Sequence, residues 1–563
     1  MKRGILVYFG AVEQAGAVAA AAERHQLRPI AVEPCSLLFA GEALPVRSMP
    51  DGGIVVGDIF SRSGATMESS REGWGNYLAF ASDGPRRTVD RAPLTGMPLY
   101  WTRHGSGIVC ASHLALLGGI LQPPSIDWEF IAHALLFINL RTDRTGLLGL
   151  SELLPGTQLA FDGATAEIKS TWSPWDHTPV EKGVQDHARE LERRILRSVA
   201  ALAGSRPEIA TELSGGLDSS IVAASLRAAG ANFSGITFAT SSADGDERHF
   251  AEAVAARCGV DLAVIQHGDE EIDLIAPPDI LLPRPGAYSV LGGIDRAFAT
   301  AYLGRDISIF GGIGGDSVFD LDGSVAPILD ALGQFGFGRR TFGTVRDVAR
   351  AGNATIWTAL RLTARASRNG RRVGGRRDPK FLNVDGLPGL QFPHPWDAGE
   401  ATAPQARINH VQAIRYILDF VDRPARWHDR DVVAPLLSQP VVEYCLSIPS
   451  WTWFTGGRNR AVARAAFAAR LPAEVVWRRD KGRLESMCSA AYLRQRPQLR
   501  DLLLGGRLAE QGLLDGPAID AYLSRDLVEG DFDYFRLIEI GDVERWVRAV
   551  ESGTGFGPSF DQR

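Results

Sequence analysis

The residues of this chain with the clearest chemical potential form one short run, 213–220, which reads Leu-Ser-Gly-Gly-Leu-Asp-Ser-Ser. An apolar stretch, 207–213, precedes the run and a helix-like stretch, 221–229, follows it. A strand, a glycine turn and a helix N-terminus in this order direct backbone N–H groups and the positive end of the helix dipole at an anion. Asp218 would repel a bare phosphate, so the run predicts a phosphate bound together with Mg²⁺. An ordinary strand-to-helix turn is the alternative, because glycine pairs are common in turns.

The same run resembles the SGGxDS pyrophosphate loop of the ATP-pyrophosphatases, and in particular of the asparagine synthetase superfamily. The resemblance implies cleavage of ATP between its α and β phosphates, transfer of AMP to a carboxylate, and displacement of the AMP by an amine. It therefore implies an AMP-forming enzyme that makes amide bonds, uses ATP and Mg²⁺ and releases pyrophosphate.

A second glycine turn, 310–319, follows an apolar stretch, 306–310, and resembles the second nucleotide motif of the same superfamily. The resemblance makes Asp316 a second Mg²⁺ ligand beside Asp218, and Mg²⁺ commonly takes one or two protein carboxylates. A simple turn residue is the alternative for Asp316. The nucleotide-binding residues implied by the resemblance are Leu213, Ser214, Gly215, Gly216, Asp218, Ser219, Ser220, Phe238, Gly312 and Gly314.

A third segment, 471–482, resembles the part of the superfamily that delivers an essential lysine just before a glycine, which here is Lys481. Only five of the 60 basic residues are lysines, so each lysine is more informative than usual. A compact ammonium suits the negative charge that builds on the acyl oxygen and the leaving phosphate, and Lys481 is the predicted catalytic residue. A surface lysine in a basic turn is the alternative.

The acidic run 244–248 has two possible interpretations. It could be part of the nucleotide site, or it could be a helix N-terminus that is enriched in acidic residues.

The first part of the chain resembles the glutaminase domain of asparagine synthetases, an α/β/β/α sandwich whose nucleophile is an N-terminal cysteine. The resembling segments are 74–80, Asp83, 96–101, 126–129 and 153–156. The glutaminase reaction needs a thiolate at position 2, where this chain has Lys2, and the nearest cysteine is Cys35. We therefore expect a retained scaffold that releases no ammonia, and an amine that already belongs to the substrate.

The second glycine turn also distinguishes members of the superfamily. Asparagine synthetases have a glutamate and β-lactam synthetases a tyrosine at the place of Ile313, which cannot accept a proton. The chain is more similar to the lasso-peptide cyclases, whose glutaminase-like domain also lacks its cysteine. That resemblance implies adenylation of an Asp or Glu side chain of a precursor (core) peptide, and closure of an isopeptide macrolactam by the N-terminal amine of the peptide. It also implies a leader peptidase and a leader-binding protein as partners.

Three other functions remain open at this point. The chain could be another amide-forming enzyme, of the asparagine synthetase or β-lactam synthetase type. It could also be a non-catalytic scaffold that binds a peptide, although Asp218, Asp316 and Lys481 argue against a loss of activity. A tRNA-modifying ATP-pyrophosphatase is disfavoured, because a net charge of −6 predicts no general affinity for nucleic acid.

The elements that must position these residues divide the chain near the polar linker 173–179. Residues 1–180 are predicted to form the inactive glutaminase-like domain, with short strands between Gly, Pro and Asp turns. Residues 181–563 are predicted to form the asparagine synthetase-like ATP-pyrophosphatase domain, in which strands and helices alternate. The predicted fold class is therefore α/β, with an α+β sandwich followed by a doubly wound parallel sheet that binds its ligand at the carboxyl ends of the strands. A mostly helical part follows from about residue 340.

Composition adds further expectations. No apolar stretch is long enough to span a bilayer, and the five cysteines are scattered, which is typical of reduced residues in a cytoplasmic protein. The segment 339–380 is rich in arginine, and its part 367–375 is predicted to be a flexible loop. A solvated basic loop and a contact for an acidic peptide or partner protein are both compatible with it.

Overall fold

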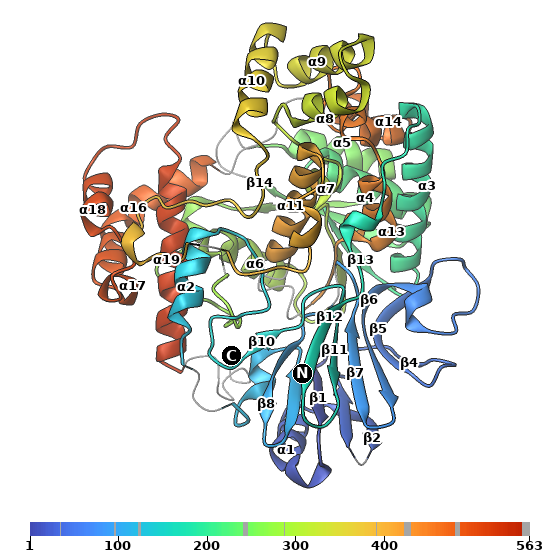
Figure 1. Ribbon diagram of the computed structural model, residues 1–563, viewed down its shortest axis with the longest axis vertical. Helices are drawn as coiled ribbons and strands as arrows, with labels where there is room; N and C mark the ends of the chain where they lie inside the picture. Colours follow the sequence, from blue (N-terminus) through green and yellow to red (C-terminus); the bar gives the residue numbers. More distant parts are fainter. Residues whose placement is uncertain are drawn as a thin grey trace.

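The computed structural model of the protein describes residues 1–33, 35–94, 97–121, 125–239, 246–286, 288–389, 391–421, 430–478 and 485–553. The N-terminal part consists of two antiparallel six-stranded sheets (Figure 1). The strand order of the first sheet is β10 (Ser151–Glu152), β8 (Tyr100–His104), β9 (Gly107–Ala111), β1 (Ile5–Phe9), β3 (Ser36–Ala40) and β2 (Arg28–Glu33). The strand order of the second sheet is β12 (Ala166–Ser170), β11 (Thr157–Phe161), β7 (Arg86–Arg91), β6 (Gly73–Asp83), β5 (Ile54–Ser61) and β4 (Val46–Ser48).

Strand β1 is buried on both faces because its five residues are all apolar. Ile5, Val7 and Phe9 pack against residues of the second sheet in the core of the sandwich. Leu6 and Tyr8 pack into a helical layer on the other face of the first sheet. The helices in this layer are α1 (Gly16–Arg24), α2 (Trp128–Leu136), α16 (Glu485–Leu504), α17 (Arg507–Glu510), α18 (Gly516–Leu523) and α19 (Asp533–Glu551). The C-terminal helices therefore share one hydrophobic core with the N-terminal sheet, and Figure 1 shows α19 beside α2.

A parallel sheet forms the centre of the second half of the chain. Its strand order is β15 (Leu262–Gln266), β14 (Phe233–Ala239), β13 (Ile209–Glu212), β16 (Ser308–Phe310) and β17 (Asp431–Val433). The helices α3 (Val184–Ala203), α4 (Leu217–Ala228) and α5 (Arg248–Cys258) contribute to the core on one face, and α6 (Ser289–Ala301) packs on the other. The strand order changes direction at β13, so the turns after β13 and β16 meet where open α/β sheets bind ligands.

The remaining helices cluster beyond the sheet, mostly in the upper part of Figure 1. They are α7 (Gly315–Val318), α8 (Ala326–Phe335), α9 (Arg339–Ala351), α10 (Ile356–Asn369), α11 (Gln405–Phe420), α13 (Gln439–Leu446), α14 (Ala461–Phe467) and α15 (Ala473–Val476). The predicted fold class is thus confirmed: a sandwich, a parallel sheet covered on both faces, and a helical part. No helix in the described ranges is both long and apolar enough to traverse a bilayer.

Two sequence predictions about segments can be compared with the structure. The boundary at 180/181 falls in the stretch between the 3₁₀ turn η4 (Pro174–Asp176) and α3, and the division into folding units there stays a prediction. The predicted flexible loop 367–375 is partly wrong, because α10 continues to Asn369. Gly370 ends that helix with φ +73°, a left-handed conformation that glycine adopts without steric cost.

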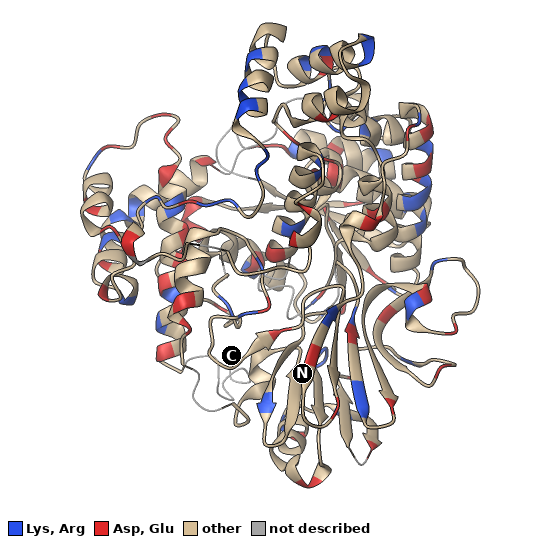
Figure 2. Cartoon of the chain, viewed as in Figure 1, with Lys and Arg blue, Asp and Glu red and all other residues tan. Residues whose placement is uncertain are grey.

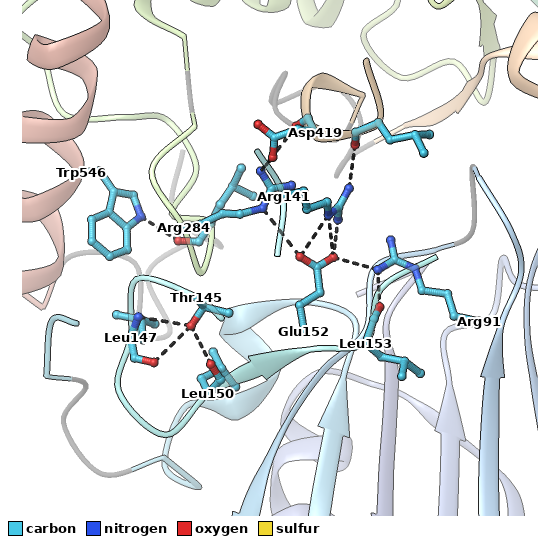
Figure 3. Close-up of polar contacts among 12 residues, drawn as sticks. Arg91, Arg141, Thr145, Leu147, Leu150, Glu152, Leu153, Arg284, Asp419 and Trp546 are labelled. Atoms are coloured by element: carbon cyan, nitrogen blue, oxygen red, sulfur yellow. Dashed lines mark hydrogen bonds and ion pairs between the residues drawn. The ribbon is translucent and has the colours of Figure 1, made fainter. Parts of the chain in front are cut away.

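A buried ion-pair network joins the first sheet to the second half of the chain (Figure 3). Glu152 of β10 has no exposed side-chain surface, and its Oε1 accepts hydrogen bonds from Arg91 at 2.8 Å and Arg141 at 3.0 Å. Arg284 lies 3.7 Å from Oε2 of the same glutamate and pairs with Asp419 of α11 at 2.6 Å. Loss of one partner from so deeply buried a network is strongly destabilising, so the network fixes how the two halves meet.

Candidate active site

The turn after β13 has the shape that its sequence predicts. Leu213 is buried at the end of the strand, and Gly215 has φ +70°. A Cβ at Gly215 would lie 2.4 Å from Cβ of Phe250, so this position has room for glycine only. Gly216 is the N-cap of α4, and its N–H donates to the exposed Ser214 hydroxyl at 3.3 Å. The N-terminus of α4 therefore opens at the carboxyl edge of the sheet, where an anion can bind to backbone N–H groups.

The two serines of the first helical turn differ in their surroundings. The Ser219 hydroxyl lies 3.2 Å from that of Ser214 and 3.3 Å from the Gly216 carbonyl oxygen. Ser220 has no exposed surface and donates its hydroxyl to the same carbonyl at 2.7 Å. The Ser220 hydroxyl thus closes the first turn of the helix here, and its contact with a phosphate stays a prediction.

The second glycine turn packs directly against the first. A Cβ at Gly312 would lie 2.4 Å from the Ser219 nitrogen, and a Cβ at Gly315 would lie 2.3 Å from Cγ of Asp218. Gly314 has φ +88°, and a Cβ there would lie 2.5 Å from Leu437. The absence of Cβ atoms in this turn therefore allows its backbone to pack against the first turn and against Leu437. Close approach of a nucleotide to Gly312 and Gly314, the role implied by the resemblance, stays a prediction.

The predicted metal ligands converge on one guanidinium. Arg460 Nη1 lies 3.1 Å from each carboxylate oxygen of Asp218 and 2.5 Å from Oδ1 of Asp316. The exposed fractions of the three side chains are 12% for Arg460, 14% for Asp218 and 36% for Asp316. Arg460 is the N-cap of α14 and has φ +53°, a left-handed conformation that is uncommon for residues other than glycine. Strained backbone of this kind is concentrated at functional sites.

This arrangement fits Mg²⁺. Two carboxylates from different turns already meet at a point that a positive charge occupies, and Mg²⁺ binds through one or two carboxylates together with phosphate and water oxygens. Within the described ranges, no three or more His, Cys, Asp or Glu side chains gather as a metal cluster, and a two-carboxylate site needs none. A cation at this point must replace Arg460 between Asp218 and Asp316.

A second arginine connects α14 to the segment that precedes the predicted lysine. Arg464 donates to the carbonyl oxygen and the side-chain oxygen of Asn459, both at 2.9 Å, and also to the carbonyl of Val476. Burial, followed by the neighbouring Arg460 and Arg458, lowers the pKa of Arg464 to about 10. The crowding of positive charge at this helix start favours an anionic ligand such as a polyphosphate.

Lys481 lies outside the described residues, but the chain just before it is firmly held. The Arg478 guanidinium pairs with Glu247 and stacks 3.9 Å from the ring centroid of Phe250, the residue that contacts Gly215. Arg478 therefore anchors its segment beside the first glycine turn.

The acidic run and Phe238 are placed only in part. Asp244 lies outside the described residues, and Asp246 pairs with Arg248, which together with a backbone N–H lowers the pKa of Asp246. Phe238, near the end of β14, packs 5.3 Å from the ring of Phe298. These contacts are structural, so both the role of the acidic run and the contact of Phe238 with a nucleotide stay predictions.

The positions that distinguish members of the superfamily are well defined. Ile313 is half-buried and packs against the core that contains α4 and α13. None of the four residues before β1 is a cysteine. Cys35 is exposed, and its carbonyl oxygen accepts from the N–H of Gly10, beyond the far end of β1. No described cysteine therefore stands at the start of that strand.

Comparison with known proteins places this site in a family. The chain matches the asparagine synthase family over residues 190–548. One solved structure, described as the allosteric regulatory enzyme of purine biosynthesis, matches with 9% identity over 49% of this chain and 82% of that chain, at a TM-score of 0.20. The glutamine phosphoribosylpyrophosphate amidotransferase from B. subtilis with ADP and GMP matches with 8% identity over 56% of this chain and 77% of that chain, at a TM-score of 0.19. Matches at these TM-scores carry no inference about activity.

The comparison with curated proteins finds no match. The family match covers both glycine turns, both carboxylates, Arg460 and the segment around Lys481. By that match, the chain belongs to the asparagine synthase family and is an ATP-dependent amide-forming enzyme.

Proposed function

We propose that this enzyme converts a side-chain carboxylate of a peptide into an acyl adenylate and closes an isopeptide macrolactam with the N-terminal amine of the same peptide. Two observations together carry the proposal. Asp218 and Asp316 meet beside the glycine turns, and no described cysteine lies at the start of β1. An amide-forming enzyme without a cysteine there has no ammonia source of its own, so the substrate brings the amine.

Ile313 supports the same choice. An acidic or phenolic side chain at this place in the second glycine turn would provide a proton acceptor near the reacting groups, but Ile313 packs into the apolar core. With isoleucine at this position, the proton of the attacking amine must go to an acceptor elsewhere, in the enzyme or in the peptide. A peptide amine as the nucleophile is compatible with such an arrangement.

The chemistry has two steps. A carboxylate oxygen of the peptide attacks the α-phosphorus of ATP, and pyrophosphate leaves with the electron pair of the broken P–O bond. The amine nitrogen then attacks the acyl carbon, AMP leaves with the electron pair of the C–O bond, and the amine loses one proton. The net change in the peptide is the loss of one water.

The residues of this chain have separable tasks in these steps. The backbone N–H groups at the start of α4 and the Ser214 and Ser219 hydroxyls bind the leaving phosphates. Asp218 and Asp316 would hold Mg²⁺, which neutralises phosphate charge when bound. Lys481 stabilises charge on the acyl oxygen and on the leaving phosphate in both transition states. Arg464 and Arg478 hold the chain that precedes Lys481, through the Val476 carbonyl and Glu247.

The proposal extends to partners. A ring that forms on the peptide N-terminal amine requires that amine to be freed from a precursor, so a leader peptidase and a leader-binding protein would act before this enzyme. The precursor (core) peptide is then the substrate.

Mass spectrometry tests the proposal with ATP, Mg²⁺ and a peptide that has a free N-terminal glycine and an Asp or Glu a few residues along. The expected result is loss of one water from the peptide, with an equal amount of AMP. Lys481→Ala should abolish the product while the thermal unfolding curve stays unchanged, because the change removes a charge from the transition state only.

Two results would contradict this assignment. Formation of asparagine from aspartate and ammonia, with no water loss from peptides, would make the enzyme a small-molecule synthetase. Normal product formation by Lys481→Ala would remove that lysine from the mechanism.

A further inference from the structure

A cavity of about 700 Å³ lies among α8, α10 and α11, apart from the glycine turns. Its apolar lining consists of Val325, Ala326, Leu329, Leu362 and Ala366. Its basic lining consists of Arg365, Arg371 and Arg372, and no Asp or Glu belongs to the described lining. We infer that this cavity docks an acidic segment of the peptide substrate, an inference that rests on the peptide substrate proposed above.

The arginines at this cavity have no acidic partner among the described residues, although Nη1 of Arg371 donates to the Ala403 carbonyl oxygen at 3.2 Å. The segment 356–377 contains seven arginines and no acidic residue, in a chain whose net charge is −6. Figure 2 shows basic residues recurring along α10 and the chain that follows it. All three lining arginines are exposed, and no ion pair between described residues includes any of them. The buried Arg206, in contrast, pairs with Asp58 and Asp431, both at 2.6 Å. The charge at the cavity is therefore available to a ligand.

The chain that presents two of these arginines is held in place by α11 and by Glu400, which precedes it. The N–H of Arg372 donates to Gln405 at 2.7 Å, and the N–H of Gly374 donates to the buried Glu400 at 2.7 Å. The N–H of Arg376 donates to the Tyr416 hydroxyl at 3.2 Å. A backbone fixed in this way presents its side chains to a ligand with little further loss of entropy.

Asp322, which precedes the first lining residue in the chain, is already engaged. Asp322 accepts from the N–H and the hydroxyl of Ser324, both at 2.7 Å, and from the amide of Asn409 at 3.0 Å. Ser324 and Asn409 both line the cavity. The carboxylate therefore stabilises the cavity wall, and the arginines set the sign of the charge inside.

The chain that lines the cavity begins a few residues after the second glycine turn. The lining begins at Gly323, a few residues after α7, and α7 carries Asp316. The N–H of Leu321, between them, donates to the carbonyl of Asp316 at 2.9 Å. A peptide docked in the cavity would therefore contact the chain that follows one predicted metal ligand.

The shape of the site favours a peptide over other anions. A concave site with an apolar lining and a few charged groups matches a peptide segment that has both aliphatic and acidic side chains. Nucleic acid is bound mainly through a continuous basic surface, and a membrane requires a broad apolar face. These two ligands are therefore the outcomes that the test must separate from a peptide.

Fluorescence anisotropy provides the test, with a labelled peptide of three Gly-Glu-Leu repeats and a matched peptide of three Gly-Gln-Leu repeats. The cavity variant is Arg365→Gln/Arg371→Gln/Arg372→Gln. The control variant is Arg361→Gln/Arg368→Gln/Arg376→Gln, which removes the same charge from the same segment at exposed residues outside the lining. We expect the cavity variant to bind the acidic peptide on the order of tenfold more weakly, because exposed pairs each contribute little and three are removed. The control variant and the binding of ATP should stay near wild type.

Other results overturn the docking site. An equal loss in both variants would show general attraction by charge alone. Tighter binding of a short single-stranded RNA, or of vesicles with anionic lipid, through the same three arginines would assign the cavity to those ligands. If the acidic peptide binds as expected but no peptide is cyclised, the docking site stands and the proposed reaction fails. If a peptide is cyclised and its KM is the same for the wild type and the cavity variant, the proposed reaction stands and the docking site fails.

Discussion

Replacement of Arg460 by alanine tests the central arrangement of the site, in which one guanidinium contacts both predicted metal ligands. Alanine keeps a Cβ, so the left-handed backbone at this position has the same steric cost in the variant and in the wild type. The change therefore removes only the contacts with Asp218 and Asp316, at 3.1 Å and 2.5 Å.

The magnitude follows from the burial of these groups. Removal of one partner from a fully buried ion pair costs roughly 3–5 kcal/mol. The side chains keep 12, 14 and 36% of their surface exposed, so solvent screening lowers the expected loss to roughly 2 kcal/mol of unfolding free energy. Mg²⁺ at about 100 times its Kd should return roughly 2.7 kcal/mol, because it binds the folded state.

The affinity for Mg²⁺ should change in the opposite direction to stability. In the wild type a cation must displace the guanidinium from Asp218 and Asp316, whereas Arg460→Ala has no guanidinium to displace. The displaced contacts are worth roughly 2 kcal/mol, and about 1.4 kcal/mol is a factor of ten in binding, so the variant should bind Mg²⁺ roughly thirtyfold more tightly in the absence of ATP.

The assay is thermal unfolding at increasing Mg²⁺, together with titration calorimetry. Arg458→Ala is the matched control, since Arg458 lies two residues away and its guanidinium stacks 4.8 Å from the Trp477 ring. If Arg460→Ala and Arg458→Ala respond to Mg²⁺ alike, the two carboxylates do not form a cation site and the reasoning fails.

Three further predictions concern stability. Glu152→Gln removes the charge that three buried arginines share, so calorimetry should show a loss of roughly 3–5 kcal/mol, and an unchanged unfolding temperature would contradict the network. Gly312→Ala places a Cβ 2.4 Å from the Ser219 nitrogen, which should cost roughly 1–3 kcal/mol of unfolding free energy and weaken ATP binding. Gly323→Ala is the control, because a Cβ there has no atom within 4 Å, and it should change neither the unfolding free energy nor ATP binding appreciably. Burial raises the pKa of Asp330 to about 6 from its ordinary value of 3.8, so the folded state favours the protonated acid, and this contribution to stability is lost as the pH rises from about 4 to 6. Asp330→Asn should therefore be more stable than wild type by up to roughly 3 kcal/mol at pH 7 and by little at pH 4, and an equal gain at both pH values would refute the shift.

The parallel sheet was predictable from local pattern. The apolar stretch 207–213 contains the observed strand β13, and the helix-like stretch 221–229 overlaps the observed helix α4. Buried strands and amphipathic helices show their periods within a few residues, and their alternation then determines the topology. The end of α10 was missed because Ser367 and Asn369 have weak helix propensity and Gly370 follows, although arginine is a good helix former.

The candidate site was predictable only in its loops. Glycine, serine and aspartate at fixed spacing revealed both turns, and the structure brings them into direct contact. Arg460 had no such signal, since its partners lie 242 and 144 residues earlier in the chain. Its neighbours in sequence do not show where its guanidinium points. The actual neighbours of Gly312 were hidden for the same reason, because contacts between distant turns are set by the tertiary fold.

The packing of α16–α19 onto the N-terminal sheet has a consequence for synthesis of the protein. The ribosome must add about 300 residues between the predicted boundary at 180 and the start of α16 at Glu485, which takes roughly 15–60 s at about 5–20 residues per second. During that time the outer face of the first sheet lacks the C-terminal part of its apolar cover. We therefore expect chaperones to bind the exposed apolar face of the nascent chain. Growth at low temperature or co-expression of chaperones should raise the yield of this protein more than that of a protein whose N-terminal domain buries its core without C-terminal helices.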